Sequence, residues 1–80
     1  MLIERLTMDE FKKGLRKTRT VIIPYGTMEA HGWHLPLNTD ALVIERVADE
    51  AAKKIPVFVA PPVYYGVCTT TAQHPGTIGI

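Results

Sequence analysis

Residues 20–40 read TVIIPYGTMEAHGWHLPLNTD, and this stretch decides the fold prediction. Its first four residues are β-branched, which is typical of a short strand that is buried on both faces. Pro24 and Gly26 end the strand, and a long loop then leads to a helix that we expect to begin near Asp40. Ligands of parallel α/β proteins bind at the carboxyl ends of the strands, so we expect the functional site in this loop.

The loop contains four side chains that can ligate a metal ion, namely Glu29, His31, His34 and Asp40. Glu29 and His31 are two positions apart, and in extended backbone such side chains point to the same side. Carboxylate and imidazole ligands suit divalent metals, and three protein ligands leave the open positions of a catalytic site. Spacing alone supports the alternative about equally: Asp40 would stabilise the helix start and the histidines would bond to backbone. His34 is the weakest candidate ligand, and we assign it instead to orienting a ligand or contacting substrate.

The rest of the chain predicts a strand–helix–strand unit behind an N-terminal helix. Thr7 and Glu10 form a capping box at the start of that first helix. The second helix covers about residues 40–54, with Thr39 or Asn38 as its cap. Its apolar stripe comprises Ile44, Val47, Ala48, Ala51, Ala52 and Ile55. A second buried strand follows at residues 57–60, and this order predicts a right-handed parallel crossover.

Composition bounds the function classes. The chain has 80 residues, so residues 1–80 form one domain at most, and its formal net charge of +1 gives no reason to expect nucleic acid or a membrane surface as partner. The single cysteine excludes an internal disulfide. The N-terminus lacks the apolar region of a signal peptide and no segment approaches the ~18 apolar residues of a membrane span, so we expect a cytoplasmic protein.

The element inventory is too small for a complete α/β domain. A parallel sheet needs both faces covered, and two or three strands with two helices barely cover one face. We therefore expect the chain to be an incomplete part of a larger domain, or one partner of a larger assembly.

Two motifs resemble a known family. Residues 26–40, GTMEAHGWHLPLNTD, resemble the N-terminal signature of the creatininase (creatinine amidohydrolase) family, roughly Gly-Ser/Thr-x-Glu-Gln-His-Gly-x-His-Leu-Pro-Leu-x-Thr-Asp. Residues 65–80, with a Tyr-Gly pair and a later Pro-Gly-Thr triplet, resemble its second signature. The resemblance implies a three-layer α/β/α fold with a mainly parallel sheet, of which this chain would be the N-terminal part.

The resemblance also implies a metal-dependent amidohydrolase that acts on a small-molecule amide, cyclic or linear, at C–N bonds other than ordinary peptide bonds. Glu29, His31 and Asp40 would hold two divalent ions, zinc and/or manganese, with Asp40 bridging them and His34 as a catalytic residue. A metal-bound hydroxide would attack the amide carbonyl. A homo-oligomer, commonly a hexamer, is the implied assembly. The family's remaining ligands, a His and a Glu, belong to a later motif that is absent here, so we expect these residues alone to be inactive.

The second signature differs from many members of the family at its polar positions. Cys68, Thr70 and Thr71 stand where Ser, Glu and His are frequent, and His74 stands where Phe is usual. We expect substrate contacts from Cys68, Thr69, Thr70 and His74, although Cys68 reads as a small buried residue rather than a nucleophile. The substrate stays open among creatinine, a formamide and a short peptide amide. The alternative function is a non-catalytic α/β interaction module or a subunit of a split protein.

Overall fold

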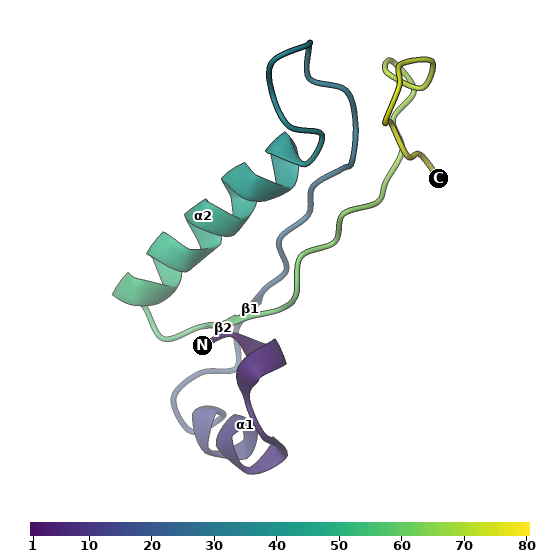
Figure 1. Cartoon of the computed structure of the whole chain (residues 1–80). Helices are drawn as coiled ribbons and strands as arrows, with labels where there is room; N and C mark the ends of the chain where they lie inside the picture. The colour runs from purple at the N-terminus through teal and green to yellow at the C-terminus, as the bar shows by residue number, and fades with distance from the viewer.

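The computed structural model describes residues 1–80 and consists of two short parallel strands with helices around them (Figure 1). In chain order the elements are the 3-10 helix η1 (Ile3–Arg5), α1 (Met8–Gly14), β1 (Val21–Ile22), α2 (Thr39–Lys54) and β2 (Phe58–Val59). The strands pair in parallel, with Val21 opposite Phe58 and Ile22 opposite Val59. The expected α/β unit with a parallel sheet is therefore confirmed. No helix is long and apolar enough to cross a membrane.

Both helices begin at the predicted cap residues, but only α1 has side-chain capping bonds. At α1, the Thr7 hydroxyl accepts from the Glu10 amide and the Glu10 carboxylate accepts from the Thr7 amide, both at 3.1 Å, so the capping box is confirmed. At α2, Asn38 is the N-cap residue but its side chain makes no capping bond, and the Thr39 hydroxyl donates to the Pro36 carbonyl instead. Asn38 has φ −93° and ψ 22°, whereas side-chain capping normally uses extended backbone.

The core lies where α2 packs on β2. Ala41 and Ala48 of α2 are buried, as are Phe58 and Val59 of β2. Small alanine side chains let the helix approach the sheet closely. The predicted apolar stripe is wrong at two positions, because Val47 is 55 % exposed and Ile55 is similarly exposed; no element of this chain covers that side of the helix.

The strand β1 is less covered than its sequence predicts. Val21 is 45 % exposed and Ile23 is 54 % exposed, so the expectation of a strand buried on both faces is wrong for this chain. β2 has neighbours on both edges, because the Val59 amide donates to the Met1 carbonyl at 2.7 Å on the side away from β1. The sheet contains β1 and β2 alone, which leaves the other edge of β1 without a strand partner.

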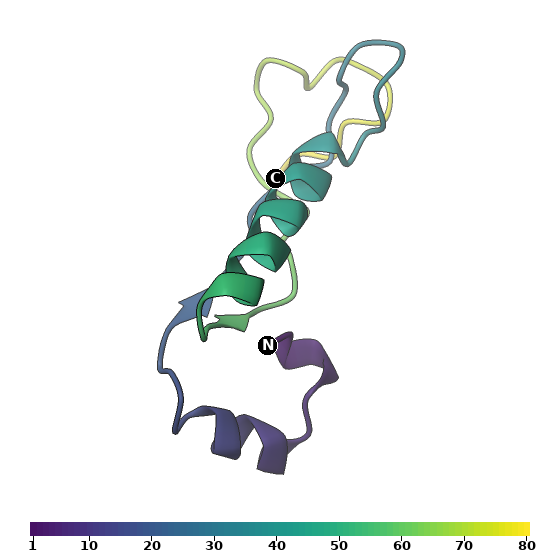
Figure 2. The ribbon, with the colours of Figure 1, turned by 90° about the vertical axis from the view of Figure 1, so that its left-hand side faces the viewer.

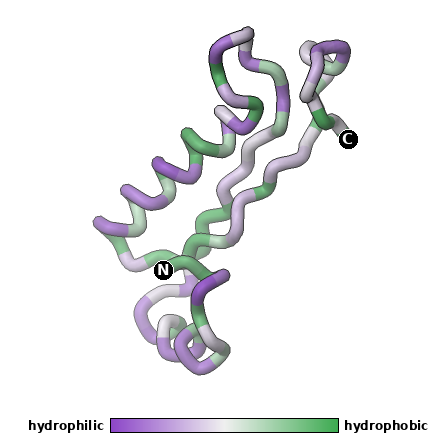
Figure 3. The backbone as a smooth tube through the Cα atoms, in the orientation of Figure 1, coloured by the Kyte–Doolittle hydropathy of each residue, from purple (hydrophilic) through white to green (hydrophobic).

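The molecule is elongated, as Figure 2 shows, with extents of 46 × 23 × 17 Å. Its radius of gyration is 15.3 Å, whereas a compact domain of this length has about 12 Å. Its accessible surface is 5988 Å², against about 4,800 Å² for a compact protein of this mass. Figure 3 shows that hydrophobic residues lie along both strands. Large hydrophobic side chains are exposed on β1 and α2, among them Val21, Val43 and Val47, and also on the segments outside these elements.

Two long segments run side by side beyond the carboxyl ends of the strands. Residues 25–38 follow β1 and residues 60–80 follow β2, and both views bring them together (Figures 1 and 2). An antiparallel bridge joins Met28 to Ile78, with the Ile78 amide donating to the Met28 carbonyl at 2.8 Å. The carboxyl end of the sheet is thus built from two segments far apart in sequence, and the candidate site lies there.

Candidate metal centre

Glu29, His31 and Asp40 come together at this end of the sheet, and one potential ligand atom of each lies within 4.8 Å of the others. Glu29 and His31 belong to the loop after β1, and Asp40 is the second residue of α2. The extended loop turns the first two side chains to the same side, and the packed start of α2 brings Asp40 towards them. All three side chains are partly exposed. The sequence predicted this group, and the fold assembles it.

The two ring nitrogens of His31 both face oxygen atoms. Nδ1 lies 3.0 Å from the Glu29 carbonyl oxygen and Nε2 lies 2.9 Å from Asp40 Oδ1. Neither oxygen can donate when Asp40 is ionised, so both contacts are hydrogen bonds only if the ring is a cation. The bond to the Glu29 carbonyl, followed by the bond to Asp40, accordingly raises the pKa of His31.

The same contacts fit a divalent metal ion. A hydrogen bond from Nδ1 to a carbonyl is the usual way in which a metal-binding histidine is held, and it leaves the Nε2 lone pair for the ion. An ion in place of the Nε2 proton would meet that lone pair and an oxygen of Asp40. Glu29 would add a further carboxylate, and this mixed set suits zinc or manganese chemically.

Asp40 is held in its ionised form by a neighbouring hydroxyl. Thr27 Oγ1 donates to Asp40 Oδ2 at 2.9 Å. This hydrogen bond is the main cause that holds the pKa of Asp40 below its usual range, and with the help of His31 it outweighs the opposite effect of partial burial. The position of Asp40 in the first turn of α2 also favours negative charge, because the helix dipole is positive there.

Glu29 is fixed from both long segments. Thr71 Oγ1 donates to Glu29 Oε2 at 2.7 Å, and the Glu29 amide donates to the Leu37 carbonyl at 3.0 Å. The next amide, that of Ala30, donates to Thr77 Oγ1 at 3.0 Å. The loop that carries Glu29 and His31 (residues 25–38, the ligand loop) is therefore held by a hydrogen bond between its own residues and by hydrogen bonds to the C-terminal segment.

Thr27 and Thr71 were not predicted as parts of the site. Thr27 lies two residues before Glu29, so the alternation of an extended segment was a usable signal for its side. Thr71 follows two more threonines and stands where His is frequent in the family, but the predicted substrate contacts are Thr69 and Thr70 instead. Only the fold shows that Thr71 is partly buried against Glu29 while the other two are exposed.

The remaining predicted site residues lie outside the three-residue group. Cys68 is 6 % exposed, and burial raises the pKa of its thiol, which confirms its interpretation as a small buried residue. Thr69, Thr70 and His74 are exposed on the second long segment. His34 is exposed in the turn that begins at Gly32, at the far end of the ligand loop.

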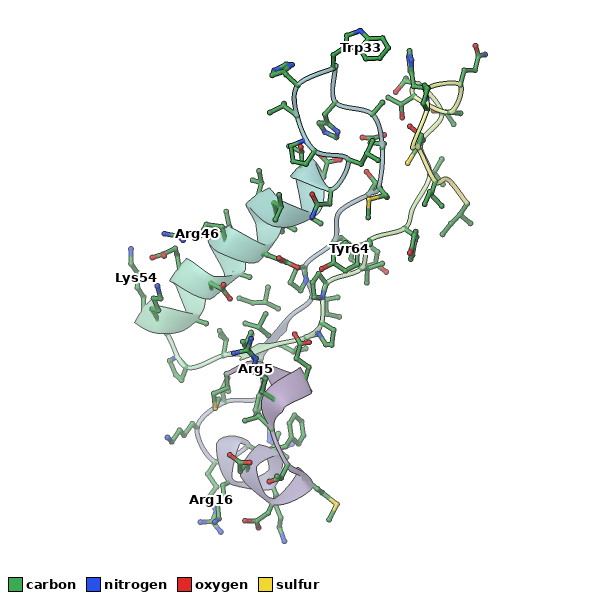
Figure 4. The ribbon with its side chains drawn as sticks, in the orientation of Figure 1. Arg5, Arg16, Trp33, Arg46, Lys54 and Tyr64 are labelled. Carbon is green, nitrogen blue, oxygen red and sulfur yellow. The ribbon has the colours of Figure 1, made fainter.

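A cleft of about 340 Å³ lies next to the loop that carries Glu29 and His31. Its lining comprises Ala30, Gly32, Trp33, Leu37, His74 and Pro75. Ala30 stands between two of the candidate ligands in sequence, so one wall of the cleft is the backbone that carries them. Trp33 is fully exposed at the tip of the ligand loop (Figure 4). His74 is the predicted substrate residue that reaches this cleft.

Comparison with known proteins gives a consistent assignment. Residues 4–80 match the family model described as creatininase, creatinine amidohydrolase. A 3-dehydro-scyllo-inosose hydrolase of Thermotoga maritima is 33 % identical over 63 residues, which cover 79 % of this chain and 20 % of that protein. A mycofactocin precursor peptide peptidase of Mycolicibacterium smegmatis is 38 % identical over 66 residues, which cover 75 % of this chain and 27 % of the peptidase.

A solved structure agrees with the sequence matches. The W154A mutant of a creatininase superposes with a TM-score of 0.89 and 26 % identity, over 99 % of this chain and 33 % of the creatininase chain. The chain thus spans between a fifth and a third of the proteins that it matches.

Proposed function

The chain belongs to the creatininase family, and from this premise we propose that it contributes the Glu29–His31–Asp40 part of the metal centre of an amidohydrolase. The observation that carries the proposal is the convergence of these three side chains at the carboxyl end of a parallel sheet. Its support is chemical as well as positional, since the donor set is that of a divalent metal site with open positions.

Each residue has a defined part in this proposal. His31 offers Nε2 and is oriented through Nδ1, while the two carboxylates offer one oxygen each and are oriented through the other. Divalent ions bound here supply Lewis acidity towards an amide carbonyl and towards water. His34, which lies outside this group, is proposed as a catalytic residue that orients a ligand or contacts the substrate. The family resemblance favours two ions, zinc and/or manganese, with Asp40 shared between them.

The substrate is proposed to be a cyclic or linear amide. The relatives named above are called an inosose hydrolase and a precursor peptide peptidase, so their names cover chemically different substrates. We propose substrate contacts from Cys68, which is nearly buried, and from the exposed residues Thr69, Thr70 and His74, of which His74 lines the cleft. A homo-oligomer, a hexamer by family resemblance, and a cytoplasmic location complete the proposal.

The test combines metal content with activity. The purified protein is analysed by elemental mass spectrometry and then assayed with creatinine, a formamide and a short peptide, before and after treatment with a chelator. In a protein completed by the family's remaining His and Glu ligands, we expect bound zinc or manganese, hydrolysis of at least one amide, and loss of both on chelation, whereas residues 1–80 alone are expected to be inactive. His31→Ala is expected to lose metal and activity together.

The rival function is a non-catalytic interaction module, and the same experiment separates the two. Absence of copurified metal from the completed protein, with fold and oligomeric state unchanged by chelator and no amide hydrolysed, would overturn the enzyme proposal in favour of the module. The uncovered apolar surface of β1 and α2 is the feature that favours this rival.

A further inference from the structure

The two carboxylates of the candidate metal centre have the same kind of hydrogen-bond partner. Each accepts a hydrogen bond from one threonine hydroxyl: Glu29 from Thr71 at 2.7 Å and Asp40 from Thr27 at 2.9 Å. An ionised carboxylate has no proton to donate, so the threonine must be the donor in both pairs. Hydrogen bonds to an ionised partner are the stronger kind.

These bonds divide the oxygens of each carboxylate between two tasks. In Asp40, Oδ2 is taken by Thr27 and Oδ1 is turned towards His31 Nε2, 2.9 Å away. In Glu29, Oε2 is taken by Thr71, which leaves Oε1 for an ion. Each carboxylate therefore has one oxygen anchored by a threonine and the other available for an ion.

The two hydroxyls reach the site from different segments. Thr27 lies in the first long segment, two residues before Glu29, whereas Thr71 is 42 residues away from Glu29 in sequence and belongs to the second long segment. Thr71 is partly buried while its neighbours Thr69 and Thr70 are exposed, so one member of a threonine triplet is selected by the fold. The second segment thereby acts on a ligand without contributing one.

We propose that Thr27 and Thr71 are positioning residues of the metal centre, which pre-orient Asp40 and Glu29 and so raise metal affinity. This inference rests on the proposed function, because it needs the two carboxylates to be ligands. Groups that orient metal ligands typically contribute about 10–100-fold to metal affinity or activity. Pre-orientation also reduces the rotamer entropy that the long Glu29 side chain would lose on binding an ion.

The experiment measures the affinity of the protein for Zn²⁺ and for Mn²⁺ by competition with a chromogenic chelator. Thr71→Val and Thr27→Val keep the shape of the side chain and remove the hydroxyl, while Thr71→Ser and Thr27→Ser keep the hydroxyl. Thr20→Val is the matched control, since Thr20 contributes backbone contacts only. Circular dichroism and denaturant unfolding check that each variant is folded.

We expect each valine variant to bind metal about 10–100-fold more weakly, each serine variant to stay close to wild type, and Thr20→Val to be unchanged. The visible spectrum of the Co²⁺-substituted protein is expected to change for the valine variants as well. Equal weakening by valine and serine, or unchanged affinity of the valine variants, would overturn the inference while the proposed function stands. A wild-type protein that binds neither ion overturns both.

Discussion

Gly26 lies directly against the first turn of α2, and Gly26→Ala tests whether that contact positions the site. The residue is buried. A Cβ atom added there would lie 2.5 Å from the Ala41 amide nitrogen and 2.6 Å from its Cα. Both are backbone atoms of the first turn of α2, so the clash cannot be relieved by rotating a side chain.

The expected cost follows from that geometry. Extra methyl groups in packed sites destabilise a protein by about 1–3 kcal/mol. Because the opposing atoms are backbone, the helix start must move, and Asp40 moves with it away from His31. Gly26→Ala is therefore expected to lower both the free energy of unfolding and metal affinity.

The assay is denaturant unfolding of the protein together with zinc competition titration, and Gly79→Ala is the control. The nearest atoms to a Cβ on Gly79 are 3.9 Å away, which is an ordinary contact. The control should therefore be unchanged or slightly more stable, since alanine restricts the unfolded chain. If Gly26→Ala is as stable as Gly79→Ala and binds zinc as tightly as wild type, the close approach does not position the site.

Three further predictions use other contacts. Asp40→Asn should keep the helical signal of α2, because Asp40 is not the capping residue. It should weaken zinc binding at least as much as the loss of a group that orients a ligand, which is about 10–100-fold. Asp49→Asn on the exposed side of α2 is the control, and equal zinc affinities of the two variants would contradict the ligand role of Asp40. Tyr64 donates to Glu45 at 2.8 Å, and this bond raises the pKa of the phenol (Figure 4). Since the pKa of Tyr64 in the folded state lies above the unfolded value, its contribution to stability is complete below about pH 10 and is lost as the pH rises through the raised pKa. Ultraviolet titration should show one tyrosine that ionises at a higher pH than the others, and Glu45→Gln should shift that ionisation to lower pH. An unshifted titration would refute the hydrogen bond between Tyr64 and Glu45. Gly32 has φ +71°, so Gly32→Ala should destabilise the ligand loop by roughly 1–2 kcal/mol, measured by unfolding, and a neutral effect would show that the turn relaxes freely.

The sequence predicted the features that depend on neighbours along the chain. The capping box of Thr7 and Glu10 is a contact across three residues. The group of Glu29, His31 and Asp40 depends on one extended loop and one helix start, both recognisable from residues 20–40. Such local contacts produce patterns in the sequence that can be recognised without knowledge of the rest of the fold.

The wrong or missing predictions depend on distant contacts. The β-branched strand around Val21 indicates two buried faces, but burial requires covering elements, and the residues of this chain cover one face. Val47 follows the helical period and is nevertheless exposed for the same reason. Thr71 reaches Glu29 across 42 positions, and no pattern within the threonine triplet identifies it.

The number of ions that each chain can bind follows from the number of ligand atoms that it offers. Glu29, His31 and Asp40 offer three ligand atoms close together, which suffices for one ion with open positions. A second ion could share Asp40, either through Oδ1 alone or through Oδ2 if that atom exchanges its bond to Thr27 for the metal. Even then that ion needs further carboxylate or imidazole donors, and residues 29–40 supply only His34, which is exposed at the far end of the loop. A measured content near two ions per chain would therefore require donors from outside this loop, whereas a content near one is what the three converging side chains can hold.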